Sequence, residues 1–278
     1  MKIRLADYIA DFLVSRGISD CFTVVGGGAM HLNDAFGHKN GLVCHYNHHE
    51  QACAIAAEAY ARLDNRPALV CVTTGPGGTN AITGVLGAWL DSIPMFVVSG
   101  QVRYDTTARY AERFTARYAE QFTNGLSLRA VGDQEFDITR SVGCMCKYAE
   151  MLEKPEDIRY MLEKAWFLMK AGRPGPVWLD IPVNYQGMTI ETDGLRGYAS
   201  EEKAALLPPH VSDETADKIL EKIAKAKRPV IYAGGGIRLS GGYKEFRLAA
   251  ERLGRPVVTY WNSVDLMEDD APLYCGRG

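Results

Sequence analysis

A glutamate at the start of a helix-forming segment is the residue of this sequence best suited to chemistry. Glu50 follows His48 and His49 and opens an alanine-rich stretch, residues 50–62, that is typical of a helix. A carboxyl group held at one fixed position can take up and release a proton, which is general acid–base catalysis. A glutamate in a first turn can also simply stabilise the helix, because the helix dipole favours an anion there. Taken alone, the residue allows both roles.

Polar or glycine-rich turns follow three further segments that we predict to be strands. These turns are residues 25–28, 73–80 and 99–101, and residues 48–50 make a fourth. In an open parallel sheet the carboxyl ends of the strands meet at one edge, where ligands bind, and glycine there lets the backbone approach a ligand closely. The pattern therefore indicates one ligand site assembled from several loops.

Two other kinds of site are suggested by short strings, and the spacing disfavours both. Cys44, His45 and His49 are metal-ligating residue types near Glu50, but the helical His-Glu-x-x-His spacing is absent because position 53 is Cys53. We therefore predict no metal site on this chain. The glycine-rich residues 75–78 precede a helix, as a phosphate-binding loop does, but the Gly-Lys-Ser/Thr ending of that motif is missing.

The elements that must position these residues alternate between strand and helix. Short apolar runs separated by helical segments predict a parallel sheet covered by helices on both faces, a three-layer α/β/α domain over residues 1–185. We read residues 186–210, rich in turn-forming types, as a linker. Residues 211–278 hold roughly two further strand–helix units, which we expect to be an incomplete second α/β domain. The predicted strands lie at residues 21–25, 42–46, 68–73, 95–99, 144–149 and 176–181.

The composition is that of an ordinary globular protein and excludes some partners. The 278 residues carry a net charge of −3, so neither nucleic acid nor an anionic membrane is expected to bind. No apolar run reaches the roughly 20 residues that span a bilayer, and the first residues lack the features of a signal peptide, so we expect a cytoplasmic protein. Most of the seven cysteines sit in apolar runs, which indicates buried thiols in a reducing compartment. On a strand, Cys144 and Cys146 would share one face.

Taken in order, these segments resemble the pyrimidine-binding domain of thiamine-diphosphate enzymes, in the acetolactate synthase-like branch. The resemblance covers essentially residues 1 to 270. It is carried by the glycine loop at 25–29, the glutamate helix from His49, the loop at 73–80, the stretch 89–94 leading to residues 99–101, and the segments 134–138, 147–148 and 172–177. The resemblance implies that residues 211–278 are part of the family's central domain.

The resemblance also implies a role for each candidate residue. Glu50 would hydrogen-bond the cofactor's pyrimidine nitrogen N1′, so that the neighbouring 4′-amino group can take its imino form and remove the thiazolium C2 proton. His49 would line the site or support Glu50. Gln134 would contact cofactor or substrate across a subunit boundary, although it also fits a surface glutamine. The expected cofactor-binding residues are Gly26, Gly27, Thr73, Gly75, Asn80 and Gln134.

The implied cofactor is thiamine diphosphate with Mg²⁺, and half of its site is not found in this sequence. The family's Gly-Asp-Gly motif, which with a later Asn binds Mg²⁺ and the diphosphate, has no counterpart; Gly132-Asp133-Gln134 is the nearest string. We therefore expect the Mg²⁺ site on a missing C-terminal domain, and a chain that is a fragment, a truncated gene product or one subunit of a split enzyme. The glycines at 234–236 could serve FAD, but we favour a structural turn.

These observations predict the N-terminal portion of an enzyme that decarboxylates or ligates a 2-keto acid. We expect a small carbonyl substrate and a homo-dimer or tetramer formed through the pyrimidine-binding domain. A separate C-terminal polypeptide is a candidate partner, without which the chain would be inactive. The alternative is a non-catalytic, cofactor-free scaffold or oligomerisation module with the same fold.

Overall fold

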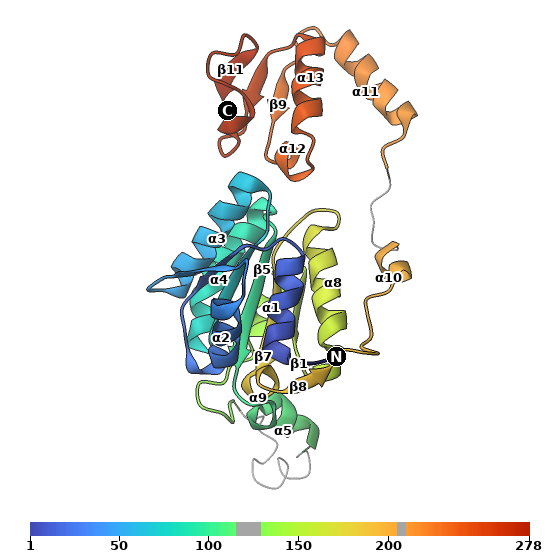
Figure 1. Cartoon of the computed structure of the whole chain (residues 1–278). Coiled ribbons are helices and arrows are strands. Elements are labelled where there is room, and N and C mark those ends of the chain that lie inside the picture. Colours follow the sequence, from blue (N-terminus) through green and yellow to red (C-terminus); the bar gives the residue numbers. More distant parts are fainter. Residues whose placement is uncertain (115–128, 205–209) are drawn as a thin grey trace. The chain divides into compact units, whose positions relative to one another are not determined.

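The computed structural model describes residues 1–114, 129–204 and 210–278. The chain divides into two compact units, Met1–Leu206 and Leu207–Gly278. Figure 1 labels the elements of both. The domain boundaries predicted from the sequence, 1–185, 186–210 and 211–278, stay a prediction.

The first unit contains eight strands among its described residues, which belong to two sheets. The strands are β1 (Lys2–Arg4), β2 (Asp20–Thr23), β3 (Val43–Tyr46), β4 (Ala68–Val72), β5 (Met95–Gln101), β6 (Tyr148–Met151), β7 (Val177–Pro182) and β8 (Thr189–Glu191). The α-helices are α1 (Leu5–Ser15), α2 (Met30–His38), α3 (Glu50–Asp64), α4 (Pro76–Asp91), α5 (Ala108–Phe114), α7 (Ile138–Val142), α8 (Ile158–Lys170), α9 (Val183–Gln186) and α10 (Ser200–Ala204). Short 3₁₀ turns are η1 (Gly27–Ala29), η2 (Tyr104–Thr106) and η3 (Pro155–Asp157).

Six of these strands form a parallel sheet in the order β3-β2-β4-β5-β7-β6. Every residue of β4, β5 and β7 is buried, which explains why they read as continuous apolar runs: helices cover both faces of the sheet. The predicted fold class, a parallel-sheet three-layer α/β/α domain, is confirmed.

Helices α1, α2 and α8 cover one face of the sheet, where they share a core with alternate residues of the central strands. Leu69 of β4, Phe96 of β5 and Leu179 of β7 belong to this core. Helices α3 and α4 pack together against the opposite face. This second layer matters for the site because Glu50 opens α3 and Asn80 lies in the first turns of α4.

The strand predicted at residues 144–149 was placed too early. Strand β6 begins at Tyr148, and Cys144 lies exposed in the turn after α7, with its Sγ 3.9 Å from the Ser141 carbonyl. Cys146 is buried. The two thiols therefore do not share a strand face, because the chain turns from α7 into the sheet at these residues. Pairing with the chain that leads into β7 starts only at Lys147, whose N–H donates to the Pro176 carbonyl.

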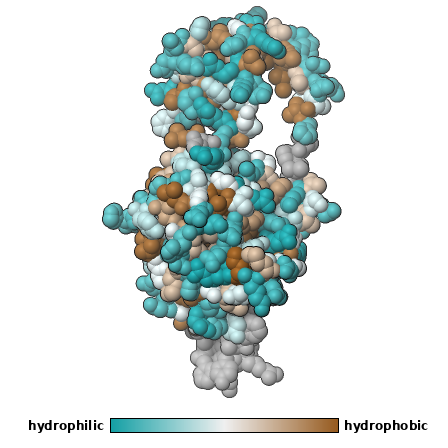
Figure 2. Space-filling view, viewed as in Figure 1, coloured by the Kyte–Doolittle hydropathy of each residue, from teal (hydrophilic) through white to brown (hydrophobic). Residues whose placement is uncertain are grey.

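The second unit has a small parallel sheet in the order β11-β10-β9. Its elements are α11 (Asp213–Lys225), β9 (Ile231–Ala233), α12 (Gly236–Leu239), α13 (Tyr243–Leu253), β10 (Val257–Thr259), η4 (Val264–Leu266) and β11 (Tyr274–Arg277). Its core is small and includes Ala233, Ala250 and Val257, whereas α11 buries none of its residues. Both units expose hydrophobic side chains scattered among hydrophilic ones (Figure 2). Among the described residues, no helix is long and apolar enough to cross a membrane.

Candidate active site

Glu50 is the first residue of α3, and the structure buries its side chain so that the residue is only 8% exposed. The turn that leads into this helix is fixed by His49, the N-cap residue. The Nδ1 atom of His49 accepts a hydrogen bond from the Gln51 N–H at 3.1 Å. This bond satisfies one of the free N–H groups at the helix start. His49 thus supports the segment that carries Glu50.

The two oxygens of the Glu50 carboxyl group have different surroundings. The Asn80 side-chain amide donates a hydrogen bond to Oε2 at 2.9 Å. No hydrogen bond reaches Oε1 from the residues that the structure describes. A methyl group added at Gly77 would lie 3.4 Å from Oε1 and 2.7 Å from the Thr73 side chain, so glycine at that position lets the start of α4 lie close to both residues. One oxygen is held in place, and the other is available to a ligand.

Close packing of α3 against α4 sets the distance between Glu50 and Asn80. A Cβ at Gly84 would lie 2.5 Å from the Ala54 Cβ and 2.8 Å from backbone atoms of α3, so only glycine allows this approach. Glu50 and Ala54 are one turn apart on α3, as are Asn80 and Gly84 on α4. The contact between Ala54 and Gly84 therefore lies one turn further along the two helices than the hydrogen bond between Glu50 and Asn80.

Thr73, at the carboxyl end of β4, connects two of the predicted loops. The Gly28 N–H donates to its Oγ1 at 3.0 Å. A Cβ at Gly26 or at Gly77 would approach the Thr73 side chain to 2.5 or 2.7 Å, so both positions require glycine. Gly27 is exposed, with no atom within 4 Å of where its Cβ would be. The structure thus brings Gly26, Gly27 and Thr73 together beside Gly77 and Glu50.

Gly75 and Gln134 meet through their backbones. Gly75 has φ +55°, and a Cβ there would lie 2.2 Å from the Gln134 carbonyl oxygen. Gln134 is itself left-handed, with φ +59°, and its side chain is exposed. The Glu135 carboxylate pins the segment by accepting hydrogen bonds from the N–H groups of Ala108 and Val131, both at 2.6 Å. Gly26, Gly27, Thr73, Gly75 and Gln134 therefore lie along one run of adjoining loops, and Asn80 joins them only through its hydrogen bond to Glu50.

Sequence reasoning missed a buried polar network beneath these loops. Gln101, the last residue of β5, donates from Nε2 to Asp180 Oδ2 and to the Phe136 carbonyl, both at 2.9 Å. Ser99 donates to Asp180 Oδ1 at 2.6 Å. Burial raises the pKa of Asp180 to about 7. A signal was available: Asp180 is the single charged residue in the otherwise apolar segment 177–181, and buried charges need partners.

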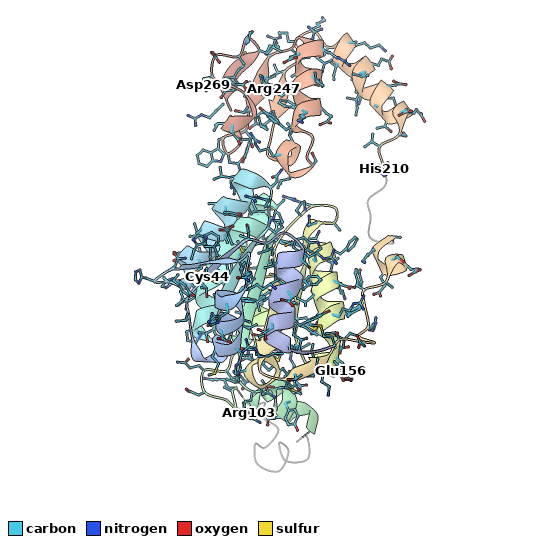
Figure 3. The ribbon with its side chains drawn as sticks, in the orientation of Figure 1. Cys44, Arg103, Glu156, His210, Arg247 and Asp269 are labelled. Atoms are coloured by element: carbon cyan, nitrogen blue, oxygen red, sulfur yellow. The ribbon has the colours of Figure 1, made fainter. Side chains whose placement is uncertain are left out.

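A cluster of charged side chains borders the network. Arg109 of α5 pairs with Asp137, the N-cap of α7, at 2.9 Å and with Glu153 at 3.3 Å. Burial acts to raise the pKa of Asp137, but the hydrogen bonds from Arg109, Thr139 and the Arg140 N–H, together with the charge of Arg109, outweigh it and hold that pKa below its usual value. Arg103, labelled in Figure 3 near α5, pairs with Asp105 at 2.9 Å. Within the described residues, no three His, Cys, Asp or Glu side chains are arranged to hold a metal ion.

Comparison with known proteins places these features in a family. Residues 3–123 match the family model described as the thiamine pyrophosphate enzyme, N-terminal TPP binding domain, and residues 216–278 match its central domain. An acetolactate synthase large subunit of Buchnera aphidicola is 33% identical over 261 residues, which are 91% of this chain and 41% of the relative. The large subunit of Lactococcus lactis is 32% identical over 89% of this chain and 39% of its own length. Acetolactate synthase 1, chloroplastic, of Oryza sativa is 32% identical over 96% and 38%. The chain thus spans about two fifths of these relatives.

Proposed function

Because the chain belongs to the thiamine pyrophosphate enzyme family, we propose that it forms the pyrimidine-binding half of an acetolactate synthase-like active site. The complete enzyme would act on a 2-keto acid by decarboxylation and carboligation. The observation that carries the proposal is the Glu50 carboxyl group, which is buried, held through one oxygen by Asn80 and open at the other.

The residues at this edge fit the aminopyrimidine ring of thiamine diphosphate. A ring nitrogen that shares a proton with a carboxyl group needs one accessible oxygen at a fixed place, and Glu50 Oε1 provides it. The backbone at Gly27 is exposed, with no atom within 4 Å of where its Cβ would be, which lets a flat ring approach this loop. The backbone of Gln134 lies against Gly75, and its exposed side chain can contact cofactor or substrate.

Each of these residues has a separate task in the proposed mechanism. Glu50 Oε1 holds a proton at the pyrimidine nitrogen and exchanges it with the ring, which is general acid–base catalysis. Asn80 prevents the carboxyl group from rotating, and His49 fixes the helix start from which Glu50 projects. When bound, the cofactor supplies the carbon nucleophile that attacks the substrate carbonyl.

The proposal assigns Mg²⁺ and the diphosphate to residues outside these 278, in a further segment or a separate polypeptide, because the relatives are longer. It includes a homo-dimer or tetramer formed through the first unit. Exposed apolar residues on α3 and α4 support this association: Ile55, Leu63, Leu86 and Leu90. The structural role of the glycines at 234–236 and the cytoplasmic location stay predictions.

The proposal can be tested on this chain with the pyrimidine half of the cofactor alone. We expect 4-amino-5-hydroxymethyl-2-methylpyrimidine to bind weakly, as measured by ligand-observed NMR titration. Glu50→Gln should weaken binding by about tenfold, because a charge-assisted hydrogen bond to the ring is replaced by a neutral one. The matched control is Glu58→Gln, two turns along the same helix, where the carboxylate pairs with Arg62.

Two results would contradict the proposal. Equal affinity in the wild type and Glu50→Gln would remove Glu50 from the site. No binding to the wild type, together with no binding of thiamine diphosphate and Mg²⁺ in the presence of any co-encoded downstream polypeptide, would favour the non-catalytic scaffold.

A further inference from the structure

We propose that Gln101 is a positioning residue that locks the loop carrying Gly75 to the segment carrying Gln134, with Asp180 as its fixed support. The proposal deepens the function proposed above, on which its consequence for the cofactor rests. The physical claim about the two loops concerns this chain alone and can be tested without any ligand.

The Gln101 side-chain amide uses all of its hydrogen-bonding capacity on different parts of the site. Its Nε2 donates to Asp180 on β7 and to the Phe136 carbonyl, two residues after Gln134. Its Oε1 accepts from the Thr74 hydroxyl at 2.6 Å and from the Val102 N–H at 2.9 Å. Thr74 immediately precedes Gly75. One buried amide thus connects both loops to strands β5 and β7.

Backbone partners fix which way this amide points. The Val102 N–H can only donate and the Phe136 carbonyl can only accept, so exchanging the amide oxygen and nitrogen would set like groups against each other on both sides. Gln101 is fully buried, so water cannot replace a lost partner. The amide therefore has one stable orientation, and the loops that bond to it are held to that orientation as well.

Asp180 supports the amide from the neighbouring strand β7. It is fully buried on β7, and its second oxygen accepts from Ser99, to which the Trp178 indole N–H donates at 2.7 Å. Arg109 and Asp137 are the charged groups that act on the Asp180 carboxyl group from α5 and the N-cap of α7. Ser99 and Trp178 belong to the network without bonding to either loop, which makes Ser99 a suitable control position.

The consequence concerns where Gln134 sits. Its backbone lies against Gly75, and the residue two positions later is held by Gln101, so the left-handed conformation of Gln134 is fixed from both sides. If Gln101 releases the Phe136 carbonyl, the exposed Gln134 side chain loses its fixed starting point. Gln101 thus acts on the site through the two loops, without contacting the cofactor or substrate itself.

Hydrogen–deuterium exchange of the full chain tests the proposal. Gln101→Met keeps the length of the side chain but none of its hydrogen bonds. We expect it to lower the protection factors of peptides covering residues 131–138 and 73–80 by at least tenfold, with little change in α1 and α8. Ser99→Ala also breaks a bond to Asp180 but should leave both loop peptides within about twofold of the wild type. Equal loosening in both variants, or no loosening in Gln101→Met, would overturn the proposal.

Gln101→Glu adds a readout that a purely structural loss would not give. One of its oxygens can accept from Thr74 and Val102 as before. The other faces Asp180 and the Phe136 carbonyl: it must carry a proton to donate to the Phe136 carbonyl, and it can accept from Asp180 only while that carboxyl group is protonated. Protection of residues 131–138 should therefore match the wild type near pH 5 and fall more than tenfold by pH 9, after correction for intrinsic exchange rates. A pH-independent loss would count against the positioning role. If the loops respond as expected but the protein binds neither the pyrimidine probe nor, with any co-encoded downstream polypeptide, thiamine diphosphate and Mg²⁺, the proposed function fails and the positioning role stands.

Discussion

At the scale of single residues, the least expected feature is a fully buried aspartate near the edge of the sheet where the carboxyl ends of the strands meet. Within the part of the chain that the structure describes, the hydrogen bonds to Asp180 come from the neutral groups of Ser99 and Gln101. Two such bonds do not compensate for the loss of hydration of a carboxylate, so burial favours the protonated form and raises the pKa to about 7. A carboxyl group of this kind makes the stability of the fold depend on pH.

The direction of that dependence follows from the two pKa values. In the unfolded chain the pKa of Asp180 is near the ordinary value of 3.8, and in the folded chain burial raises it to about 7. Between these values the folded state binds more protons, so the stabilisation is present at low pH and is lost as pH rises through 7. We expect the wild type to lose roughly 3 kcal/mol of unfolding free energy between about pH 5 and pH 8 relative to Asp180→Asn, from the conversion of about 1.4 kcal/mol per pH unit.

Urea unfolding of both proteins at the two pH values measures this difference. Asp180→Asn can keep both contacts, because its amide oxygen accepts from Gln101 and its nitrogen donates to Ser99, which turns from donor to acceptor. Parallel pH profiles for the wild type and the variant would show that Asp180 does not titrate in this range.

At the scale of elements, the site depends on two parallel helices that pack unusually close. Glycine at 84 lets α4 approach the α3 backbone, whereas a Cβ at Gly87 would meet only the flexible end of the Glu58 side chain, 2.8 Å from Oε2. Both positions are helical, so alanine gains the same helix propensity at each, about 1 kcal/mol. Any difference between the two substitutions therefore reports the contact between the helices.

We expect Gly84→Ala to destabilise the protein by about 1–3 kcal/mol, because the helices must separate, and to weaken binding of the pyrimidine probe as Asn80 moves away from Glu50. Gly87→Ala should be neutral or slightly stabilising. Chemical denaturation and the NMR titration check both effects. If the two variants are equally stable, the helices tolerate a wider spacing and Gly84 does not set the geometry of the site.

The sequence predicted the local part of this arrangement well. Alternating apolar runs and helices indicated the parallel sheet, and the motif around Glu50 located its helix start at the observed residue. Helix α4 begins at Pro76, earlier than predicted. Proline fits the first helical turn, whereas its neighbours Gly77 and Gly78 had suggested a loop. The contact of Gln101 with Asp180 joins residues 79 positions apart: the lone charge in an apolar segment indicates that Asp180 needs a partner, but nothing local to either residue identifies that partner.

At the scale of the whole molecule, the residues predicted as a linker contribute to the first unit. Strand β8 pairs antiparallel with β1, two strands too short to be recognised by periodicity. Ile190 of β8 is part of the core beneath α1, and Tyr198, only 5% exposed, packs against Tyr160 and Phe167 of α8. Residues 205–209, at the end of the predicted linker, lie outside the described residues.

Two shortened chains distinguish the predicted boundary near 185 from the observed division near 206. A chain of residues 1–204 should unfold at the same temperature as the first unit of the full chain, because every contact described above is kept. A chain of residues 1–186 loses the partner of β1 and exposes the surfaces covered by Ile190 and Tyr198. Burial of two such side chains stabilises the fold by roughly 3 kcal/mol or more. Losing it should lower the melting temperature of a domain of this size by about 6–12 °C. Calorimetry of the two chains measures the shift. Equal melting temperatures would mean that residues 187–204 contribute no stability to the first unit, and that the domain ends near residue 185, as predicted from the sequence.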